Sequence, residues 1–340
     1  MNLKTIAQKA GVSTATVSNV INGNYHKVSR ETIERVQKII EETNYKPNAT
    51  ARSLVSKKSN IIGVVLPNIG ENQSFSVNPH YAHLLALLEQ YIRNQGYYMM
   101  LRCVQQSKDS IPMLSSWNVD GIVFLGTFRS EVEEIKQRLT IPAVFIDTYA
   151  EDMDIANVGV DDYKGGYLSA QYLLSKGHRK IAFVGPSIEM LDVMQHRYEG
   201  FRDAFAENGV ELERKHIYIS NTLYDSGVRA GKRIAASGTD YTAVAVMSDI
   251  AAFGVMEGLR IGGKRIPEDI SVIGFDNLLE CQYSYPRLTT ISQNIEQKAE
   301  KAGKLLFAMI RKEPTAESWE KNDVCVVERN SVRDLNEEME

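Results

Sequence analysis

The sequence has few cysteines and no arrangement of them that suggests a metal site or a disulfide framework. Among 340 residues there are three, Cys103, Cys281 and Cys325, and they lie far apart and match no metal-ligand spacing. An odd number of scattered cysteines is typical of buried thiols in a reducing compartment. We therefore expect no metal site and no disulfide.

Long apolar runs are also missing. The longest, at residues 61–66 and 243–247, have the length of a strand and fall far short of the roughly 20 residues that a membrane helix needs. The first ten residues contain Lys4 and Lys9 and begin no signal-length apolar segment. The expectation is a cytoplasmic protein with no membrane partner.

The motifs of common enzyme classes are absent. No Gly-x-Gly-x-x-Gly or Walker loop follows a predicted strand, and no Ser, His and Asp occur in a nucleophile-elbow setting. His80 and His83 are three residues apart, but no third metal ligand lies near them in the sequence. We therefore expect no catalytic residue and no cofactor, and we do not expect an enzyme.

The net charge of −4 is the average of two oppositely charged parts. Residues 1–60 contain ten Lys or Arg and four acidic residues, a charge of +6, so the remaining 280 residues carry −10. A basic head on an acidic body is typical of a nucleic-acid-binding module joined to a domain that does not bind nucleic acid. Solvated surface lysines alone can give the same excess of positive charge, so the charge by itself does not establish nucleic-acid binding. The residue pattern of the head distinguishes the two.

The head has the pattern of a helix-turn-helix. Residues 3–10 carry apolar side chains at helical spacing, and Gly11 is suited to the turn that follows. Ser13 is placed to cap a second helix over residues 14–21, and a third helix is predicted after Ser29. Two short helices joined by a Gly-Val-Ser turn favour a module whose second helix enters the major groove of DNA.

The outward face of that second helix carries small and hydroxylated side chains, which allow a close approach to DNA. Thr16 and Ser18 can donate hydrogen bonds to phosphates, while Thr14, Ala15 and Asn19 can meet base edges or thymine methyl groups. The candidate DNA-binding residues of the head are Ser13, Thr14, Ala15, Thr16, Ser18, Asn19 and Asn22.

Residues 3–23, LKTIAQKAGVSTATVSNVING, resemble the headpiece of the lactose-repressor and galactose-repressor (LacI/GalR) family of bacterial transcription regulators. Residues 44–54, NYKPNATARSL, are similar to the family's hinge segment. The resemblance implies a hinge helix over residues 47–58 that forms on DNA, with Leu54 as the leucine that wedges into the minor groove. A linker leucine packed on the body is the alternative. The family often has Arg at the position of Asn19, so the operators of relatives need not transfer to this chain.

From residue 59 onward, short apolar strands alternate with amphipathic helices, which predicts an α/β fold with buried parallel sheets. One set of strands is expected at residues 61–66, 97–103, 121–125 and 143–147, and a second set at 181–184, 243–247 and 271–275. Helices are expected at residues 81–94, 163–175, 198–208, 226–236 and 250–261. Two sets of strands predict two lobes.

The body also resembles the sensor of the same family, which is similar to periplasmic sugar-binding proteins. The matching segments are DGIV at 120–123, KGHRKIAFVG at 176–185, RYEGF at 197–201, ISVIGFDN at 270–277 and PRLTTI at 286–291. The resemblance implies a headpiece over residues 1–46, the hinge helix over 47–58, and a two-lobed effector-binding and dimerisation domain over 59–340. Lobe 1 is expected to cover about 59–160 and 292–321, and lobe 2 about 161–291 and 322–340.

Charged side chains stand where a ligand of such a fold binds, at the carboxyl ends of the strands. Asp147 and Asp276 end two predicted strands, and Arg197 is expected in a loop just before a helix. Carboxylates and a guanidinium suit adjacent sugar hydroxyls, although a strand-end Asp is equally suited to capping a turn. The effector residues that the resemblance implies are Tyr81, Asp147, Arg197, Ser248, Asp249 and Asp276.

The sequence therefore predicts a sequence-specific DNA-binding transcriptional regulator, in particular a repressor, controlled by a small molecule between the two lobes. A sugar or sugar derivative is the expected effector. Residues 331–340 lack leucine heptads, so we expect a homodimer on a palindromic double-stranded operator. The alternatives are a solute-binding protein with no role in transcription and a regulator that responds to a nucleobase.

Overall fold

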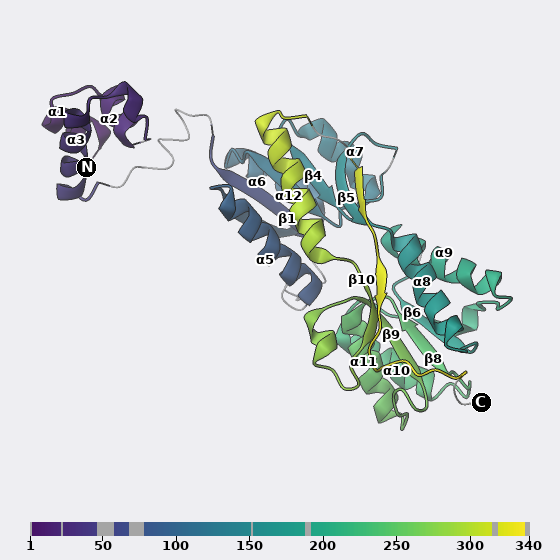
Figure 1. The fold of residues 1–340 in the computed structure, drawn as a ribbon. Helices are drawn as coiled ribbons and strands as arrows, with labels where there is room; N and C mark the ends of the chain where they lie inside the picture. The colour runs from purple at the N-terminus through teal and green to yellow at the C-terminus, as the bar shows by residue number, and fades with distance from the viewer. Residues whose placement is uncertain are drawn as a thin grey trace. The chain divides into compact units, whose positions relative to one another are not determined.

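The structure is a computed structural model with two compact units, residues 1–60 and 61–340. The residues that it describes are 2–21, 23–45, 58–67, 78–150, 152–187, 192–314 and 319–336 (Figure 1).

The described residues of the first unit form three α-helices around a small apolar core, as predicted for residues 3–10, 14–21 and the segment after Ser29. Its elements are α1 (Leu3–Ala10), α2 (Thr14–Ile21), a 3-10 turn η1 (Tyr25–Lys27) and α3 (Arg30–Glu42). Gly11 ends α1 in the left-handed conformation, with φ at 66°, which a residue with a side chain rarely adopts. The buried core residues are Ile6, Ala7, Ala10, Val17, Val20 and Val36.

The second unit begins with a six-stranded sheet in which every described pair of neighbours is parallel. The strand order is β11-β5-β4-β3-β1-β2. The strands are β1 (Ile61–Pro67), β2 (Tyr98–Val104), β3 (Gly121–Leu125), β4 (Ala143–Ile146), β5 (Ala156–Val160) and β11 (Trp319–Asn322). We call this sheet and the helices that cover it lobe 1.

A second six-stranded sheet, with the order β12-β10-β9-β8-β6-β7, forms lobe 2 with its helices. Its pairs are parallel except for β10 with β12. The strands are β6 (Ile181–Gly185), β7 (Ile217–Ile219), β8 (Ala243–Val246), β9 (Ser271–Asp276), β10 (Thr289–Ser292) and β12 (Cys325–Val327). The two parallel sheets confirm the predicted α/β class.

Helices pack on both lobes, as buried parallel strands require. In lobe 1, α12 lies beside α5 and against β3, β4 and β5 (Figure 1). In lobe 2, α8 packs on α9 and α10 on α11. The lobe 1 helices are α5 (Pro79–Asn94), α6 (Ile111–Ser116), α7 (Arg129–Arg138) and α12 (Ile295–Arg311). The lobe 2 helices are α8 (Asp162–Ser175), α9 (Asp192–Glu207), α10 (Tyr224–Ala235) and α11 (Asp249–Ile261). Short 3-10 turns are η3 (Ser107–Ser110), η4 (Arg214–His216) and η5 (Leu279–Gln282).

Three segments connect the lobes, and they are hydrogen-bonded to one another. The chain crosses from β5 to α8, from β10 to α12 and from β11 to β12. The Asp161 backbone N–H donates to the Asn322 carbonyl (3.1 Å), and the Asn322 side-chain amide donates to the Asn294 carbonyl (3.4 Å). These bonds join the connections at the point where the lobes meet.

One helix begins earlier than its sequence pattern predicts. The pattern predicts a helix from Tyr198 with Arg197 in the loop before it, whereas α9 begins at Asp192 and contains Arg197. Arg197 lies on the same buried face as Met194 and Phe201, at i−3 and i+4. A charged residue on an apolar helix face was mistaken for a residue outside the helix.

Candidate functional site

The turn between α1 and α2 presents the predicted DNA-contacting residues. The Ser13 hydroxyl accepts a hydrogen bond from the Thr16 backbone N–H at 3.1 Å, which caps the free N–H groups of α2. Val17 and Val20 are buried against α1 and α3, so they fix which face of α2 points outward. The sequence therefore folds into a short helix whose early residues are the most accessible ones.

The candidate residues of α2 lie on its accessible face. Ser13, Thr14 and Ala15 are exposed, and Thr16, Ser18 and Asn19 are partly exposed. Asn22 and Leu54, the two other candidates, lie outside the described residues, as does most of the predicted hinge at residues 47–58. The accessible candidates thus lie on either side of the buried Val17, on the outward face of the second helix of the helix-turn-helix.

A second group of polar residues lies in the body, where the lobes meet. Asp147 directly follows β4, with a backbone φ of 55°. The Lys298 ammonium on α12 donates to both of its carboxylate oxygens, each at 2.8 Å, and to the Gln293 side-chain oxygen at 2.8 Å. Lys298 is fully buried. All three ammonium protons therefore have acceptors.

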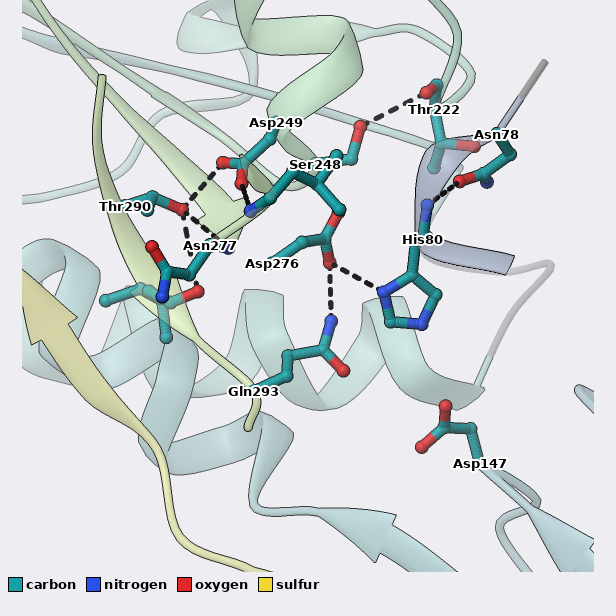
Figure 2. A network of polar contacts seen from close by, with 12 residues as sticks. Asn78, His80, Asp147, Thr222, Ser248, Asp249, Asp276, Asn277, Thr290 and Gln293 are labelled. Atoms are coloured by element: carbon teal, nitrogen blue, oxygen red, sulfur yellow. Dashed lines mark hydrogen bonds and ion pairs between the residues drawn. The ribbon is translucent and has the colours of Figure 1, made fainter. Parts of the chain in front are cut away.

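Gln293 continues this chain of bonds from lobe 1 to lobe 2. Its amide nitrogen donates to the carboxyl of Asp276, the last residue of β9 (Figure 2). His80 of α5 approaches the same carboxyl oxygen, with Nδ1 at 3.8 Å from Oδ1. His80 Nδ1 is buried and has no hydrogen-bond partner among the described residues. Asp276 thus stands between two groups that lobe 1 and its connection contribute.

Burial keeps this part of the site uncharged. It raises the pKa of Asp276 to about 8, with the charge of Asp249 adding to the rise and Arg197 opposing it. Burial lowers the pKa of His80 to about 3, and the charge of Lys298 lowers it further. At neutral pH the carboxyl is therefore mostly protonated and the imidazole is neutral.

Arg197 is held within lobe 2 by three contacts. Its Nε donates to Asp162 at 2.6 Å, its terminal nitrogen donates to the Met247 carbonyl at 2.9 Å, and the guanidinium lies 3.6 Å from the centre of the Phe275 ring. The Tyr149 hydroxyl, on the loop after β4, donates to the other oxygen of Asp162. A buried, oriented guanidinium therefore faces the boundary between the lobes.

A glycine allows this arrangement of α8 and α9. A Cβ atom at Gly166 of α8 would lie 1.8 Å from the Arg197 carbonyl oxygen, far inside any real contact. The two helices touch backbone to backbone at this position, which brings Asp162 and Arg197 within bonding distance.

Tyr81 lies on α5, beside His80, with the two rings edge to face and 5.7 Å apart. Burial raises the pKa of the Tyr81 hydroxyl to about 12, and Asp147 and Asp276 raise it further. The phenol therefore lies within electrostatic reach of both predicted carboxylates and remains a hydrogen-bond donor.

The two remaining candidates are placed differently. Ser248 caps α11 and donates to the Thr222 carbonyl at 3.2 Å. Asp249, the first residue of α11, is fully buried, and Figure 2 shows it directed away from Asp276 toward Thr290 and the chain that follows β9. Its oxygens accept bonds from the Thr290 hydroxyl (2.6 Å), the Leu278 N–H (2.9 Å) and the Cys281 thiol (3.0 Å). Asp249 therefore connects α11 to β10 and to the chain that follows β9.

The structure brings together Tyr81, Asp147, Arg197 and Asp276. It adds Gln293 and Lys298, which the sequence did not single out, and His80, which the sequence pattern raises only as a candidate metal ligand. We define the interlobe site as His80, Tyr81, Asp147, Arg197, Asp276, Gln293 and Lys298. The position of Lys298 could have been recognised in the sequence. It lies on the apolar face of α12, with Ile295 and Ala302 at i−3 and i+4, and a lysine on such a face needs a buried partner.

Comparison with known proteins agrees with this geometry. Residues 2–48 match the model of bacterial regulatory proteins of the lacI family, and residues 170–332 match that of a periplasmic binding protein-like domain. The transcriptional repressor PurR of Vibrio parahaemolyticus is 34% identical over 98% of this chain and 99% of its own length. This chain belongs to the lacI family of bacterial regulatory proteins.

Other relatives have the same organisation. The transcriptional regulator RegA of Clostridium saccharobutylicum is 29% identical over 92% of this chain and 93% of its own. The fold matches that of the Lac repressor dimer bound to operator and the anti-inducer ONPF, with a TM-score of 0.87 at 24% identity, over 98% of this chain and 99% of that one. It also matches a CelR–cellobiose complex, with a TM-score of 0.73 at 26% identity, over 97% and 99%.

The family assignment confirms the predicted function at the level of a lacI-family transcriptional repressor with an effector-binding domain. The head that matches residues 2–48 argues against a solute-binding protein with no role in transcription. Among the described residues, no helix has the length and apolarity needed to cross a membrane. In the same part of the chain, no three His, Cys, Asp or Glu side chains gather as a metal site would require.

Proposed function

We propose that the interlobe site binds a sugar or sugar derivative and that binding changes the affinity of the headpiece for a palindromic operator. The observation that carries this proposal is the convergence of hydrogen-bonding groups from both lobes: Tyr81 and Asp147 from lobe 1, and Arg197 and Asp276 from lobe 2. Paired carboxyl, phenol and guanidinium groups suit a ring with several adjacent hydroxyls. The CelR relative that is bound to cellobiose supports a carbohydrate.

A ligand between the lobes can control DNA binding only through different affinities for two lobe arrangements. Two contacts depend on that arrangement, because each joins the lobes: Lys298 of α12 with Gln293, which follows β10, and Tyr149 with Asp162. A ligand that replaces or reinforces them shifts the equilibrium. A coupling of about 1–3 kcal/mol is typical of allosteric proteins.

On the DNA side, we assign base and phosphate contacts to Ser13, Thr14, Ala15, Thr16, Ser18, Asn19 and Asn22. The accessibility of the early α2 residues and their small size support this assignment. Leu54 is assigned the role of a minor-groove wedge within the hinge at residues 47–58, on the basis of its sequence context. The headpiece is assigned to residues 1–46 and the effector-binding domain to residues 59–340.

We propose that two copies of the chain pair, in part, through an apolar surface of lobe 2. Several large side chains of lobe 2 are exposed, and a cluster of such side chains is typical of a protein–protein interface. The exposed fraction is 90% for Tyr285, 73% for Tyr283, 56% for Leu279 and 56% for Ile261. A two-fold dimer brings two headpieces to two half-sites. The Lac repressor relative is a dimer bound to operator.

A nucleobase is the second candidate effector. Aromatic rings surround the site: Tyr81 lies against His80, and Tyr149 lies against His196 with ring centres 4.5 Å apart. Such rings suit the face of a planar base, while Asp276 and His80 offer groups for its edge. We further propose that the protein works in the cytoplasm, where its DNA is, and that it catalyses no reaction.

A thermal-shift screen of the full chain against monosaccharides, disaccharides, sugar phosphates and nucleobases tests the proposal, because selective binding raises the melting temperature. The result expected is stabilisation by a small set of related sugars. Stabilisation by nucleobases alone would favour the second candidate. Turnover of a metabolite at substoichiometric protein would contradict the assignment as a regulator without catalysis.

A further inference from the structure

Lys298 carries an unusual feature of the interlobe site. It is a lysine on the apolar face of a helix, it is fully buried, and its three protons are all donated within 2.8 Å: two to Asp147 and one to Gln293. A lysine in such a place is stable only when it is paired and saturated with hydrogen bonds. Asp147 is therefore a partner in a closed ion pair and carries no uncompensated charge toward a ligand.

The second cation of the site is compensated in the same way. Arg197 is 4% exposed, and its closest carboxylate, Asp162, is 2% exposed and lies 2.6 Å from Nε. Each lobe thus contributes one ion pair to the site, and the two opposite charges within each pair cancel. Neither ammonium nor guanidinium has an excess of positive charge to offer.

The remaining titratable groups of the site add no charge at neutral pH. The pKa of the Asp276 carboxyl is raised to about 8 by burial, and that of His80 is lowered to about 3. His80 Nδ1 is buried and has no hydrogen-bond partner in the described part of the chain, 3.8 Å from the Asp276 carboxyl. A hydroxyl group, which both donates and accepts, can bridge these two atoms from roughly 2.8 Å.

We propose that the interlobe site selects an uncharged polyhydroxylated effector over its phosphorylated counterpart, and that Lys298 sets this selectivity by holding Asp147 in a closed ion pair. The inference rests on the proposed function and defines its ligand class. A phosphate dianion brought into this site would lose its hydration and meet no uncompensated cation among the described residues that form the site, which is costly in a buried environment. A neutral ring replaces water hydrogen bonds with those of Asp276, His80 and Tyr81.

Matched pairs of probes test the selectivity in the full chain. Ribose, glucose and fructose are each compared with their phosphomonoesters by thermal shift, followed by calorimetric titration of any compound that stabilises the protein. Stabilisation only by uncharged members supports the proposal. A phosphomonoester that binds more tightly than its parent sugar would overturn it. If neither the sugars nor their phosphomonoesters bind, the proposed sugar-binding function itself is contradicted.

Variants test the role of Lys298 by changing the charge of the site in both directions. Asp147→Asn frees the ammonium and adds one positive charge, so the preference for the parent sugar over its phosphomonoester should fall by about tenfold or more. Lys298→Met removes the cation, and the double variant D147N/K298M is neutral again and should regain the preference of the unmodified protein. Lys304→Met, on the exposed side of the same helix, is the matched control.

The sugar-over-phosphomonoester preferences of these variants distinguish an electrostatic role of Lys298 from a purely structural one. A purely structural role of Lys298 predicts the same preference in every variant that folds. Such a result would refute the proposal while leaving the proposed function intact. The melting temperature of each variant provides a second measurement, because Lys298→Met leaves Asp147 without its partner and D147N/K298M should recover most of the stability lost.

Discussion

The substitution Asp276→Asn isolates the one carboxyl of the interlobe site that is expected to be protonated at neutral pH. Its pKa is raised from the ordinary 3.8 to about 8, mainly by burial and then by the charge of Asp249. In the unfolded chain the same group ionises near pH 4. Between pH 4 and pH 8 the folded carboxyl is protonated and the unfolded one is ionised, so unfolding releases a proton. The free energy of unfolding is therefore highest below pH 4 with respect to this group and falls as the pH rises to 8. Asparagine has a similar shape and does not titrate.

The magnitude follows from the width of the window. One titrating proton changes the free energy of unfolding by at most about 1.4 kcal/mol per pH unit. Two buried histidines act in the opposite direction at lower pH, because burial lowers the pKa of His80 to about 3 and of His178 to about 4, from 6.5. Both proteins contain these histidines, so their contribution cancels in the comparison, and raising the pH from 6.5 to 8 should cost the unmodified protein about 2 kcal/mol relative to D276N.

Urea unfolding of both proteins at pH 6.5, 7, 7.5 and 8 measures this difference. The stability of D276N relative to the unmodified protein should rise steadily through this range and level off above it. Parallel curves would show that the Asp276 carboxyl is ionised throughout, which refutes both the protonation of Asp276 and the neutral site built on it.

Three further substitutions probe other parts of the molecule. Gly166→Ala places a Cβ atom 1.8 Å from the Arg197 carbonyl oxygen, so it should lower the free energy of unfolding by about 3 kcal/mol or more in urea unfolding; a loss below about 1 kcal/mol would mean that the two helices separate easily. Arg197→Ala leaves Asp162 buried without its cation and should cost about 3–5 kcal/mol. The paired variant R197M/D162N should regain stability but lose the effector response with DNA binding intact, and a normal dose response would remove Arg197 from the site. Leu54→Ala should weaken specific operator binding in a gel-shift assay much more than non-specific binding, whereas an equal loss in both would exclude the wedge.

The sequence was most informative where local signals agreed. Gly11, Ser13 and the apolar spacing of residues 3–21 predicted the helix-turn-helix, because the turn, the cap and the buried face are all encoded locally. Runs of buried apolar residues predicted β1 to β4 of lobe 1 and β6, β8 and β9 of lobe 2 in the same way. Short strands such as Thr289–Ser292 and Trp319–Asn322 were missed, since they carry few apolar residues.

The partners of the site residues could not be read from the sequence, because they depend on how distant segments pack. Lys298 is 151 residues from Asp147, and only the packing of α12 against β4 brings them together. Asp249 looked like Asp276 in the sequence, since each stands at a strand end. The structure separates them: Asp249 accepts three bonds within lobe 2, whereas Asp276 meets Gln293 and His80.

A ligand of the interlobe site should control the binding of the headpiece to DNA. The most direct test is a fluorescence-anisotropy titration of the full chain on a duplex selected from a random library, with and without the sugar that most stabilises the protein. We predict a two-fold symmetric selected sequence and a ligand-dependent change in its Kd of roughly 5- to 150-fold, the usual range of allosteric coupling. An unchanged Kd at saturating ligand would contradict the account.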